Sequence, residues 1–249
     1  MTKQTSKNAV LIYNGYKIHQ NASAYTIEAK FAAEDVTGFG EQSQNFVPGI
    51  LTAKMGWDFF WDQAALQTHA ALGALAAPPG YATMLPEGYT LGCRSINMVC
   101  QQVNYNPAGA ASGSPISVGT IQFEYNGEGP GLEFGECLYS GTITNTLSGS
   151  TAVPDAYNIL TATTAISAAT IQVFTPTAAD TYVVKVQTSD DGATSWGDWI
   201  TFTVDGLTRT AQRVTHASGA VKAYRRIVAT RTGGANNPFG FNVTFWRAG

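Results

Sequence analysis

The fold of this 249-residue chain is decided by one segment, DVTGFGEQSQNFVPGILTAKMGWDFFWD, which runs from Asp35 to Asp62. An acidic start and several glycines predict a loop in its first half, and Pro48-Gly49 predicts a turn. Alternating apolar residues from Ile50 to Trp61 then predict a strand that ends among aromatic residues. We therefore expect a long loop, Asp35–Gly49, that leaves a β-sheet and returns to it as a strand.

The predicted loop is too long for an ordinary hairpin tip, and it carries large apolar side chains. An isolated loop does not usually expose such side chains without a partner to cover them. We therefore predict an inter-subunit contact arm that contains Val36, Thr37, Phe39, Phe46, Val47 and Pro48. The alternative is that Phe39 and Phe46 fold back onto the sheet of their own chain.

The flanking sequence also predicts β-structure, with one helix. Ala9–Ile18 is predicted to be a hairpin around Asn14-Gly15, which is a strong turn signal. Ala24–Ala32 alternates as a half-buried strand does. A single helix is expected over about residues 62–76, because the segment is rich in Ala and Leu and is followed by Pro78-Pro79-Gly80.

The carboxyl-terminal part is a series of short strands separated by turns and without a helix signal. This spacing is typical of a sandwich or barrel. Tyr182, Val184 and Val186 are predicted to face the core, and Tyr224 is expected to pack inward as well. The predicted strands are Ile171–Phe174, Tyr182–Thr188, Trp199–Val204, Thr210–Thr215, Ala223–Thr230 and Phe239–Phe245.

The predicted fold class is mainly β, an antiparallel sandwich or barrel with one helix, followed by a second all-β part. Residues 1–149 would form the first domain, with its helix. Residues 150–249 would form a carboxyl-terminal β-sandwich, either separate from the first domain or integrated with it.

Composition restricts the class of protein. Charged residues make up 12% of the chain, about half the ~25% of an average domain, while hydrophobic content is ordinary at 44%. Disordered chains show the opposite balance. Residues 1–149 carry eleven acids and six bases, for a net −5, and residues 150–249 carry six acids and eight bases, for a net +2. A basic nucleic-acid-binding surface is not indicated.

The three cysteines, Cys93, Cys100 and Cys137, are too few and too irregularly spaced for a disulfide framework or a metal site. We expect buried free thiols, which suits assembly in a reducing cytoplasm. The amino terminus lacks the apolar core of a signal peptide, and no apolar run is long enough for a membrane-spanning helix.

Catalytic, cofactor-binding and metal-binding residues are not predicted. The three histidines, His19, His69 and His216, lack the sequence context of a catalytic base, and no nucleotide-binding, nucleophile-elbow or zinc-protease motif occurs. The acidic, glycine-rich segment Glu124–Glu136 suggests calcium, but it lacks EF-hand spacing. We interpret it as a solvated turn between strands.

The segment Ser189–Trp199, SDDGATSWGDW, supports an alternative function. It resembles the Asp-box motif S-x-D-x-G-x-x-W, although Ala193 stands where that motif has glycine. Aspartate in such a turn usually caps backbone N–H groups, which favours a structural role. If exposed, Trp196 or Trp199 would stack on a sugar, so the alternative to a structural role is a carbohydrate- or receptor-binding β-sandwich protein.

The opening segment resembles tail tube proteins of phages with long, non-contractile tails. The matching pattern is a "VT-x-x-G" turn, a "PG-[IL]" turn and a strand leading into "G-x-[WFY]-D". The residues that carry it are Val36, Thr37, Gly40, Pro48, Gly49, Ile50, Gly56, Trp57 and Asp58. The order of predicted elements extends the resemblance over residues 9–145, and the carboxyl half is less distinctive.

This resemblance implies a structural protein of the virion tail, assembled in the host cytoplasm, and not an enzyme. The alternative, a carbohydrate- or receptor-binding protein, would then be a virion protein of the decoration or tail-tip class. Its subunits would form rings, most simply of six copies, although a chain with two similar sandwiches could form a comparable ring from three. The stacked rings would conduct DNA to the host without binding it specifically. Implied partners are other copies of the chain and tail proteins such as the tape measure and the tail terminator, with no membrane insertion.

Overall fold

The computed structural model describes residues 8–37, 43–62, 68–73, 79–107, 116–154, 166–176, 180–205, 208–217, 219, 221–233 and 237–248. They form a mainly β protein, which confirms the predicted fold class. Its helical elements are a 3-10 turn, His19–Asn21, and helix α1, Thr68–Leu72. Residues 63–67 and 74–76 of the expected helix lie outside the described residues.

The chain divides into two compact units that are discontinuous in sequence. Unit 1 contains Met1–Gln20, Tyr81–Asn97 and Glu133–Gly249, and unit 2 contains Asn21–Gly80 and Met98–Leu132. The expected boundary at residues 149 and 150 coincides with neither unit. The physical reason is strand pairing across long sequence separations, which places β8 (Leu132–Ile143) beside the carboxyl-terminal strand β15 (Phe239–Arg247).

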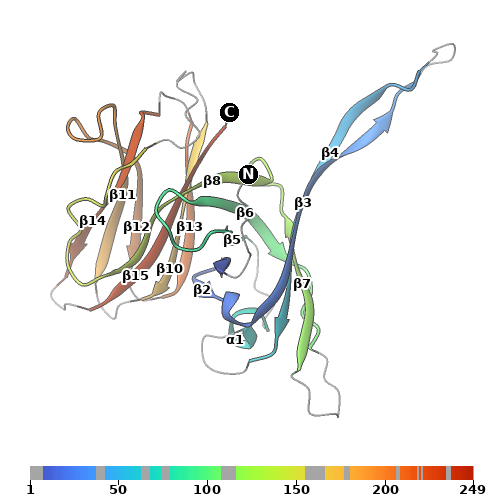
Figure 1. Ribbon diagram of the computed structural model, residues 1–249, viewed down its shortest axis with the longest axis horizontal. Helices are drawn as coiled ribbons and strands as arrows, with labels where there is room; N and C mark the ends of the chain where they lie inside the picture. Colours follow the sequence, from blue (N-terminus) through green and yellow to red (C-terminus); the bar gives the residue numbers. More distant parts are fainter. Residues whose placement is uncertain are drawn as a thin grey trace. The chain divides into compact units, whose positions relative to one another are not determined.

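Unit 1 is a β-sandwich of two antiparallel sheets (Figure 1). One sheet contains, in order, β13 (Thr210–His216), β10 (Ser167–Thr175), β15 (Phe239–Arg247), β8 (Leu132–Ile143), β6 (Arg94–Gln102), β5 (Gly80–Leu85), β1 (Val10–Tyr13) and β2 (Tyr16–Lys17). The other contains β12 (Gly197–Asp205), β11 (Thr181–Ser189), β14 (Tyr224–Thr232) and β9 (Val153–Pro154). The predicted carboxyl-terminal strands are thus confirmed.

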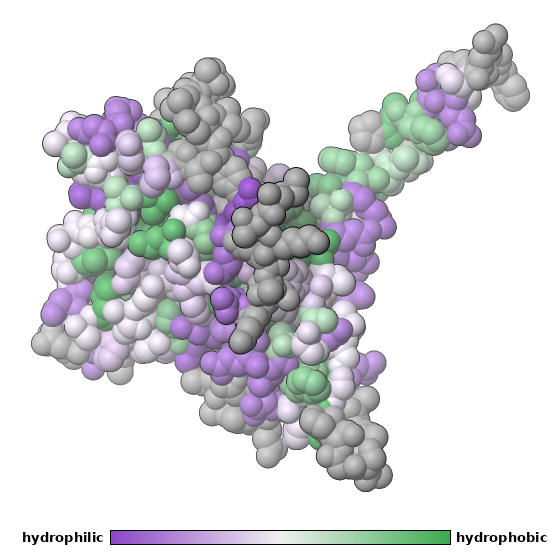
Figure 2. Space-filling view, viewed as in Figure 1, coloured by the Kyte–Doolittle hydropathy of each residue, from purple (hydrophilic) through white to green (hydrophobic). Residues whose placement is uncertain are grey.

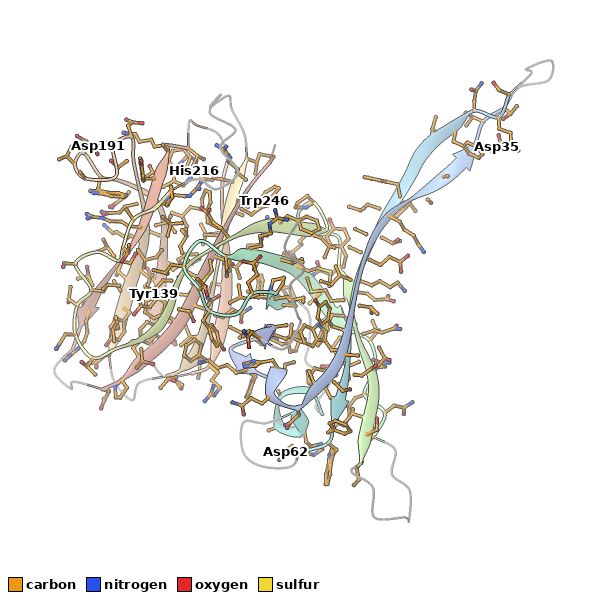
Figure 3. All side chains as sticks on the ribbon, viewed as in Figure 1. Asp35, Asp62, Tyr139, Asp191, His216 and Trp246 are labelled. Carbon is orange, nitrogen blue, oxygen red and sulfur yellow. The ribbon has the colours of Figure 1, made fainter. Side chains whose placement is uncertain are left out.

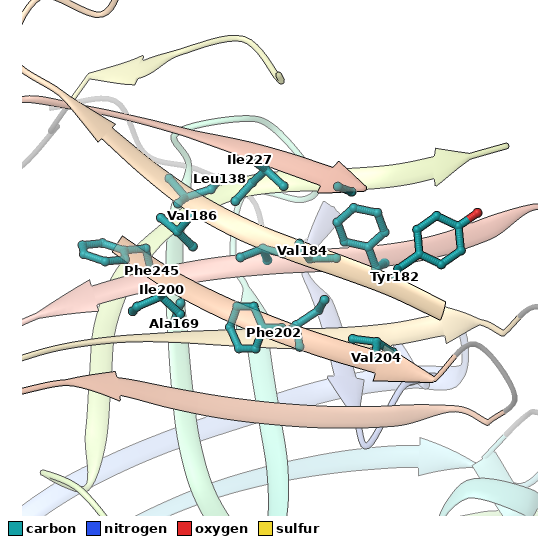
Figure 4. Packing of buried hydrophobic residues seen from close by; sticks show 14 of the residues in the cluster. Leu138, Ala169, Tyr182, Val184, Val186, Ile200, Phe202, Val204, Ile227 and Phe245 are labelled. Carbon is teal, nitrogen blue, oxygen red and sulfur yellow. The ribbon is translucent and has the colours of Figure 1, made fainter. Parts of the chain in front are cut away.

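The core of unit 1 lies between these sheets and is built by period-two alternation. Tyr182, Val184 and Val186 of β11 are fully buried, as predicted. They meet inward side chains of β10, β15 and β8 (Figure 4). Tyr182 stacks on Phe239 with the ring centroids 4.0 Å apart. This apolar layer is the main source of stability of the sandwich.

The prediction for Tyr224 was wrong by one residue. Tyr224 is only half-buried, and the side chain of its neighbour Arg225 is 1% exposed. Arg225 bonds to Glu136 of β8 at 2.5 Å, and its guanidinium lies 4.9 Å from the Phe245 ring. A charge survives burial only when it is paired. The partner lies 89 positions away in sequence, so the local pattern could not reveal it.

The acidic segment Glu124–Glu136 is likewise only partly a solvated turn. β8 begins at Leu132, and both Glu133 and Glu136 are buried in that strand. Glu133 pairs with Arg213 of β13. Burial raises the pKa of the Glu133 carboxyl, and the hydrogen bond from Arg213 acts in the opposite direction. The two glutamates therefore belong to the interior of unit 1.

Other local predictions are confirmed. Asn14 and Gly15 have φ angles of 46° and 80°, as a two-residue turn between β1 and β2 requires. The three cysteines are buried thiols that form no disulfide.

Unit 2 is formed by β3 (Ala22–Asp35), β4 (Phe46–Phe60), β7 (Ser117–Tyr125) and residues 98–102 of β6. Its sheet has β4 between β3 and β7, and β7 pairs with the end of β6. Trp57, Phe59, Ile121 and Phe123 are buried on one face. Leu72 of α1 is also buried, and its carbonyl accepts a hydrogen bond from the Gln102 side chain at 2.8 Å.

Candidate assembly surface

The hairpin of β3 and β4 continues beyond the strand that covers it. β7 pairs with β4 from Phe60 back to Lys54, where the pairing stops at Glu124. β3 and β4 stay paired with each other as far as Asp35 and Phe46. We call the uncovered part, residues 31–51, the arm; the structure describes it at 31–37 and 43–51 (Figure 1). We call the remaining part of the hairpin, Ala22–Lys30 and Thr52–Phe60, the inner half.

An irregularity in the register marks the start of the arm. Phe31 pairs with Leu51, and the next aligned pair joins Ala33 to Pro48, so β4 carries one extra residue there. The predicted Pro48-Gly49 turn is therefore wrong, because both residues lie within β4. Strand β4 begins at Phe46 and not at Ile50. Proline is tolerated where no second strand needs its missing N–H, and β7 does not reach Pro48.

Large apolar side chains of the arm are exposed to solvent. The exposed fraction is 60% for Phe31, 52% for Val36, 55% for Phe46, 45% for Val47 and 78% for Ile50. Figure 2 shows this apolar surface as green patches along the hairpin, beyond the rest of unit 2. By contrast, Leu51 is half-buried and packs closely against Gly131. Its side chain occupies the space that a Cβ atom at Gly131 would need. Leu51 thus marks the limit of the cover.

The exposed side chains occupy both faces of the arm. Phe46 and Val47 are consecutive in β4, and consecutive side chains of a strand point to opposite faces. An amphipathic strand would keep one of these faces polar. An apolar two-stranded ribbon with neither face covered is a typical protein-interaction surface.

The described part of the arm tip is closed by a polar turn. The Asp35 carboxylate accepts hydrogen bonds from the Thr37 amide, at 2.9 Å, and from the Thr37 hydroxyl. The Asn45 amide donates to the Thr37 hydroxyl at 2.9 Å, and the Val36 amide donates to the Asn45 carbonyl at 2.9 Å. The hydrogen bonds from Thr37 lower the pKa of Asp35 below its ordinary value of 3.8. Asp35 and Asp62 lie at opposite ends of the hairpin in Figure 3.

The structure brings together four of the six predicted arm residues, Val36, Thr37, Phe46 and Val47, at the end of the ribbon. Phe39 lies outside the described residues, and for Pro48 only the backbone is described. Phe46 does not fold back onto its own sheet, so that alternative is wrong for this residue. Sequence reasoning missed Phe31 and Ile50, because alternation alone cannot show where cover by β7 ends.

The outer edge of β3 adds backbone groups to this surface. Among the described strands β3 pairs with β4 alone, so its other edge is unpaired along 14 residues. Such an edge readily accepts a strand from another molecule. The salt bridge between Glu28 and Lys30, at 2.6 Å, places charge on that edge, and charged side chains restrict which strands can approach it.

The polar face of the inner half contrasts with the arm. Glu28, Lys54 and Glu124 are aligned across β3, β4 and β7, and Lys54 bonds to Glu124 at 2.6 Å. The same face carries Asp58, which accepts a hydrogen bond from the Thr120 hydroxyl. Unit 2 as a whole contains two bases and eight acids, so its net charge is 2 − 8 = −6, and unit 1 contains twelve bases and nine acids, so its net charge is 12 − 9 = +3.

The Ser189–Trp199 segment forms the turn between β11 and β12, as its sequence suggests. Asp191 accepts hydrogen bonds from the amides of Ala193 and Thr194 at 2.9 and 2.8 Å, and from the Ser189 hydroxyl at 2.7 Å. Bonds from Thr194, Ala193 and Ser189 hold the pKa of the Asp191 carboxyl far below its ordinary value. The aspartate thus caps the turn.

Both tryptophans of this turn already have partners within unit 1. The Trp199 indole N–H donates to the Ser167 hydroxyl at 2.9 Å, and its ring stacks on His216 at 4.0 Å. Trp196 is half-buried and carries the Arg226 guanidinium 4.3 Å from its ring. Their proposed contact with a glycan stays a prediction, and these contacts account for both rings structurally.

Groups of histidine, cysteine, aspartate or glutamate arranged to hold a metal ion do not occur among the described residues. His19 and His216 lie in unit 1, and His69 lies in unit 2, where it bonds to the Tyr105 hydroxyl at 2.7 Å. The described helices are too short to cross a membrane.

Comparisons with known proteins give distant matches. Neither a protein-family model nor a curated protein matches the chain. A chain in the virion of a native gene transfer agent particle aligns with a TM-score of 0.40 at 13% identity, covering 53% of this chain and 98% of that chain. The Dit protein of SPP1, described as a paradigm of the hub adsorption apparatus in phages infecting Gram-positive bacteria, aligns with a TM-score of 0.35 at 12% identity, covering 97% and 100%.

The VP2 subviral particle of infectious bursal disease virus aligns with a TM-score of 0.26 at 12% identity, covering 96% of this chain and 54% of that one. These TM-scores are too low to establish a common fold.

Proposed function

We propose that this chain is a structural virion protein whose arm joins copies into stacked rings that form a phage tail tube. The observation that carries the proposal is the two-sided apolar surface of the arm, with Ile50 78% exposed and Phe46 55% exposed. A stable monomer rarely leaves such a ribbon uncovered, and burial of these side chains by another copy would contribute about 25 cal/mol for each Å² removed from water.

Two further features support assembly from identical copies. Once the arm has brought two copies together, the open edge of β3 can be continued by a strand of the neighbouring copy, which would join subunits around a ring. A contact between two different surfaces of identical subunits closes into a ring or continues as a filament. Six copies in each ring is the simplest arrangement, and the tape measure and tail terminator are the expected partners at the tube ends.

The charge distribution suits a DNA channel. Unit 2 has a net charge of −6, and its polar face carries its two lysines paired with glutamates. A wall of this kind would repel phosphate groups and let DNA pass without specific binding. We place the polar face of the inner half toward the channel on this basis.

Shortening the arm tests the proposal. Because Phe31 and Leu51 are directly paired, residues 32–50 can be replaced by Asn-Gly, which closes a two-residue hairpin. We call this the arm-deleted variant. It should remain a folded monomer, seen by circular dichroism and light scattering, while the unmodified chain forms rings or tubes under negative-stain microscopy. Normal tubes from the arm-deleted variant would refute the proposal.

A matched pair of substitutions separates the arm from general surface hydrophobicity. Phe46 in the arm and Phe134 in β8 of unit 1 have nearly equal exposed fractions, 55% and 56%. Phe46→Ser should raise the critical assembly concentration strongly, and Phe134→Ser should raise it much less. Equal effects would show that hydrophobicity alone, and not the arm, drives association.

A further inference from the structure

Two basic side chains of unit 1 lie by the Asn14-Gly15 turn without an acidic partner among the described residues: Arg209 donates to the Gly15 carbonyl, and Lys17 follows two residues later. Lys17 ends β2, and Arg209 directly precedes β13. Other bases of unit 1 do have carboxylate partners. Arg213 bonds to Glu133, and Arg225 bonds to Glu136. Among the described residues, no carboxylate lies within ion-pair distance of Lys17 or Arg209. We call these two side chains the basic pair.

The fold holds the basic pair in place. The turn at Asn14-Gly15 packs against β10 and β13. A Cβ atom at Gly15 would clash with the Val173 carbonyl oxygen. The Gly15 amide donates to the Gln172 side chain at 2.8 Å, and Arg209 donates to the Gly15 carbonyl at 3.2 Å. The hairpin that carries Lys17 is thus clamped to the strand that follows Arg209.

Aromatic rings surround both cations. The Lys17 ammonium lies 3.4 Å from the ring centroid of Phe174 and 5.0 Å from that of Tyr89, and the Arg209 guanidinium lies 5.5 Å from the ring of Tyr16. Burial lowers the pKa of Lys17, and the nearby charge of Arg209 lowers it further. Both cations are half-buried, and no carboxylate among the described residues offsets the repulsion between them.

The neighbouring groups do not neutralise the pair. A cavity of about 400 Å³ beside it is lined by residues that include His19, Glu87 and Tyr89. Burial lowers the pKa of His19, which favours its neutral form. Glu87 is the carboxylate of this cavity, and it forms no ion pair with Lys17. An anion bound there would therefore lie next to two cations that no described carboxylate neutralises.

We propose that the basic pair, with its aromatic rings, receives the acidic arm of a second copy of this chain. The arm contains Glu34, Asp35 and Glu41 and no lysine or arginine, so its net charge is 0 − 3 = −3. It also presents the exposed rings of Phe31 and Phe46. The negative charge of the arm thus complements the two cations, and the opposite net charges of the two units agree with this contact.

The contact is head-to-tail, because the arm belongs to unit 2 and the basic pair to unit 1. Every copy then carries one donor surface and one acceptor surface, and such contacts propagate. This inference rests on the proposed function, and it adds the surface that the arm binds.

Mixing two half-defective variants tests the contact. The arm-deleted variant keeps the basic pair, and a Lys17→Gln/Arg209→Gln variant keeps the arm. Each should be monomeric alone, and an equimolar mixture should give a heterodimer that grows no further, measured by size-exclusion chromatography with light scattering. Its dissociation constant should rise about tenfold or more between low and high salt, because the pairing is electrostatic.

The control is Arg226→Gln, which removes another half-buried cation stacked on an aromatic ring, Trp196. When Arg226→Gln is tested in the same way as the Lys17→Gln/Arg209→Gln variant, it should leave assembly unchanged. Thermal unfolding of all variants checks that the sandwich is intact. If the double variant is unfolded, neutralising the arm instead, by Glu34→Gln, Asp35→Asn and Glu41→Gln, should abolish its binding to the arm-deleted variant.

The outcomes are distinguishable. Assembly of the arm-deleted variant would overturn the proposed function. If that variant is monomeric but the Lys17→Gln/Arg209→Gln variant still forms tubes, the arm binds elsewhere and this inference is overturned. It is also overturned if the mixture stays monomeric while a short DNA duplex binds the arm-deleted variant and loses binding on removal of the basic pair, since the site then serves phosphate.

Discussion

The inner half of the β3–β4 hairpin and the arm consist of the same two strands, yet they bury different surfaces. In the inner half, Met55, Trp57 and Phe59 are buried on one face, and Lys54 and Asp58 lie on the other. In the arm, Phe46 and Val47 are exposed on opposite faces. The difference begins where β7 ends. It teaches that an apolar strand becomes core or interface according to which element covers it.

The largest expected effect contrasts one buried and one exposed apolar residue of this hairpin. Trp57→Ala should lower the free energy of unfolding by about 3–5 kcal/mol, because the ring is 2% exposed and stacks on Tyr25 at 5.2 Å. Ile50→Ala should change it by no more than about 0.5 kcal/mol but impair assembly. Urea denaturation at a concentration that keeps the chain monomeric measures both. Equal losses would erase the distinction between the two halves.

A second effect extends the comparison to the tryptophans of unit 1. Trp199→Ala should destabilise the chain by about 1–3 kcal/mol, through lost packing and the lost hydrogen bond to Ser167. Trp196→Ala should cost less, about 0.5–1 kcal/mol, because it loses mainly the contact with Arg226. Denaturant unfolding ranks the two. Loss of glycan binding without loss of stability at Trp199 would instead favour the carbohydrate-binding alternative.

Hydrogen exchange sharpens the comparison along the hairpin itself. In the monomer, amides of the inner half that bond between β4 and β7 should be protected, and those of the arm should exchange much faster, because local opening there exposes little covered surface. Assembly should slow exchange in the arm and change the inner half little. Unchanged arm exchange in assembled tubes would contradict its burial by a neighbour.

The smallest expected effect concerns the turn at the arm tip. Hydrogen bonds from Thr37 lower the pKa of Asp35, so the carboxylate stabilises the folded tip above its unfolded pKa. That contribution is lost as the pH falls through the lower, folded pKa. Thr37→Val should raise the pKa of Asp35 toward 3.8, as measured by NMR titration of the carboxyl carbon. An unchanged pKa would mean that Thr37 does not close the turn in solution.

Much of the fold followed from the sequence because its signals are local. The turn at Asn14-Gly15 and the alternation of Tyr182, Val184 and Val186 are determined by neighbouring residues. The prediction for Tyr224 was wrong, and the one for the Glu124–Glu136 segment was wrong in part, for the opposite reason. Arg225 is stabilised in the core by Glu136, and Glu133 by Arg213, from distant strands.

The candidate site, too, was predictable from the sequence only in part. The sequence by itself determined that apolar residues such as Phe46 and Val47 fall in a segment with little reason to expose them. It could not show that the pairing of β7 with β4 stops at Lys54, that Phe31 and Ile50 join the same surface, or that Lys17 and Arg209 lie by the same turn. Cover and charge pairing are properties of residues distant in the chain. Only the tertiary structure decided which apolar residues stay uncovered and which cations have no carboxylate partner among the described residues.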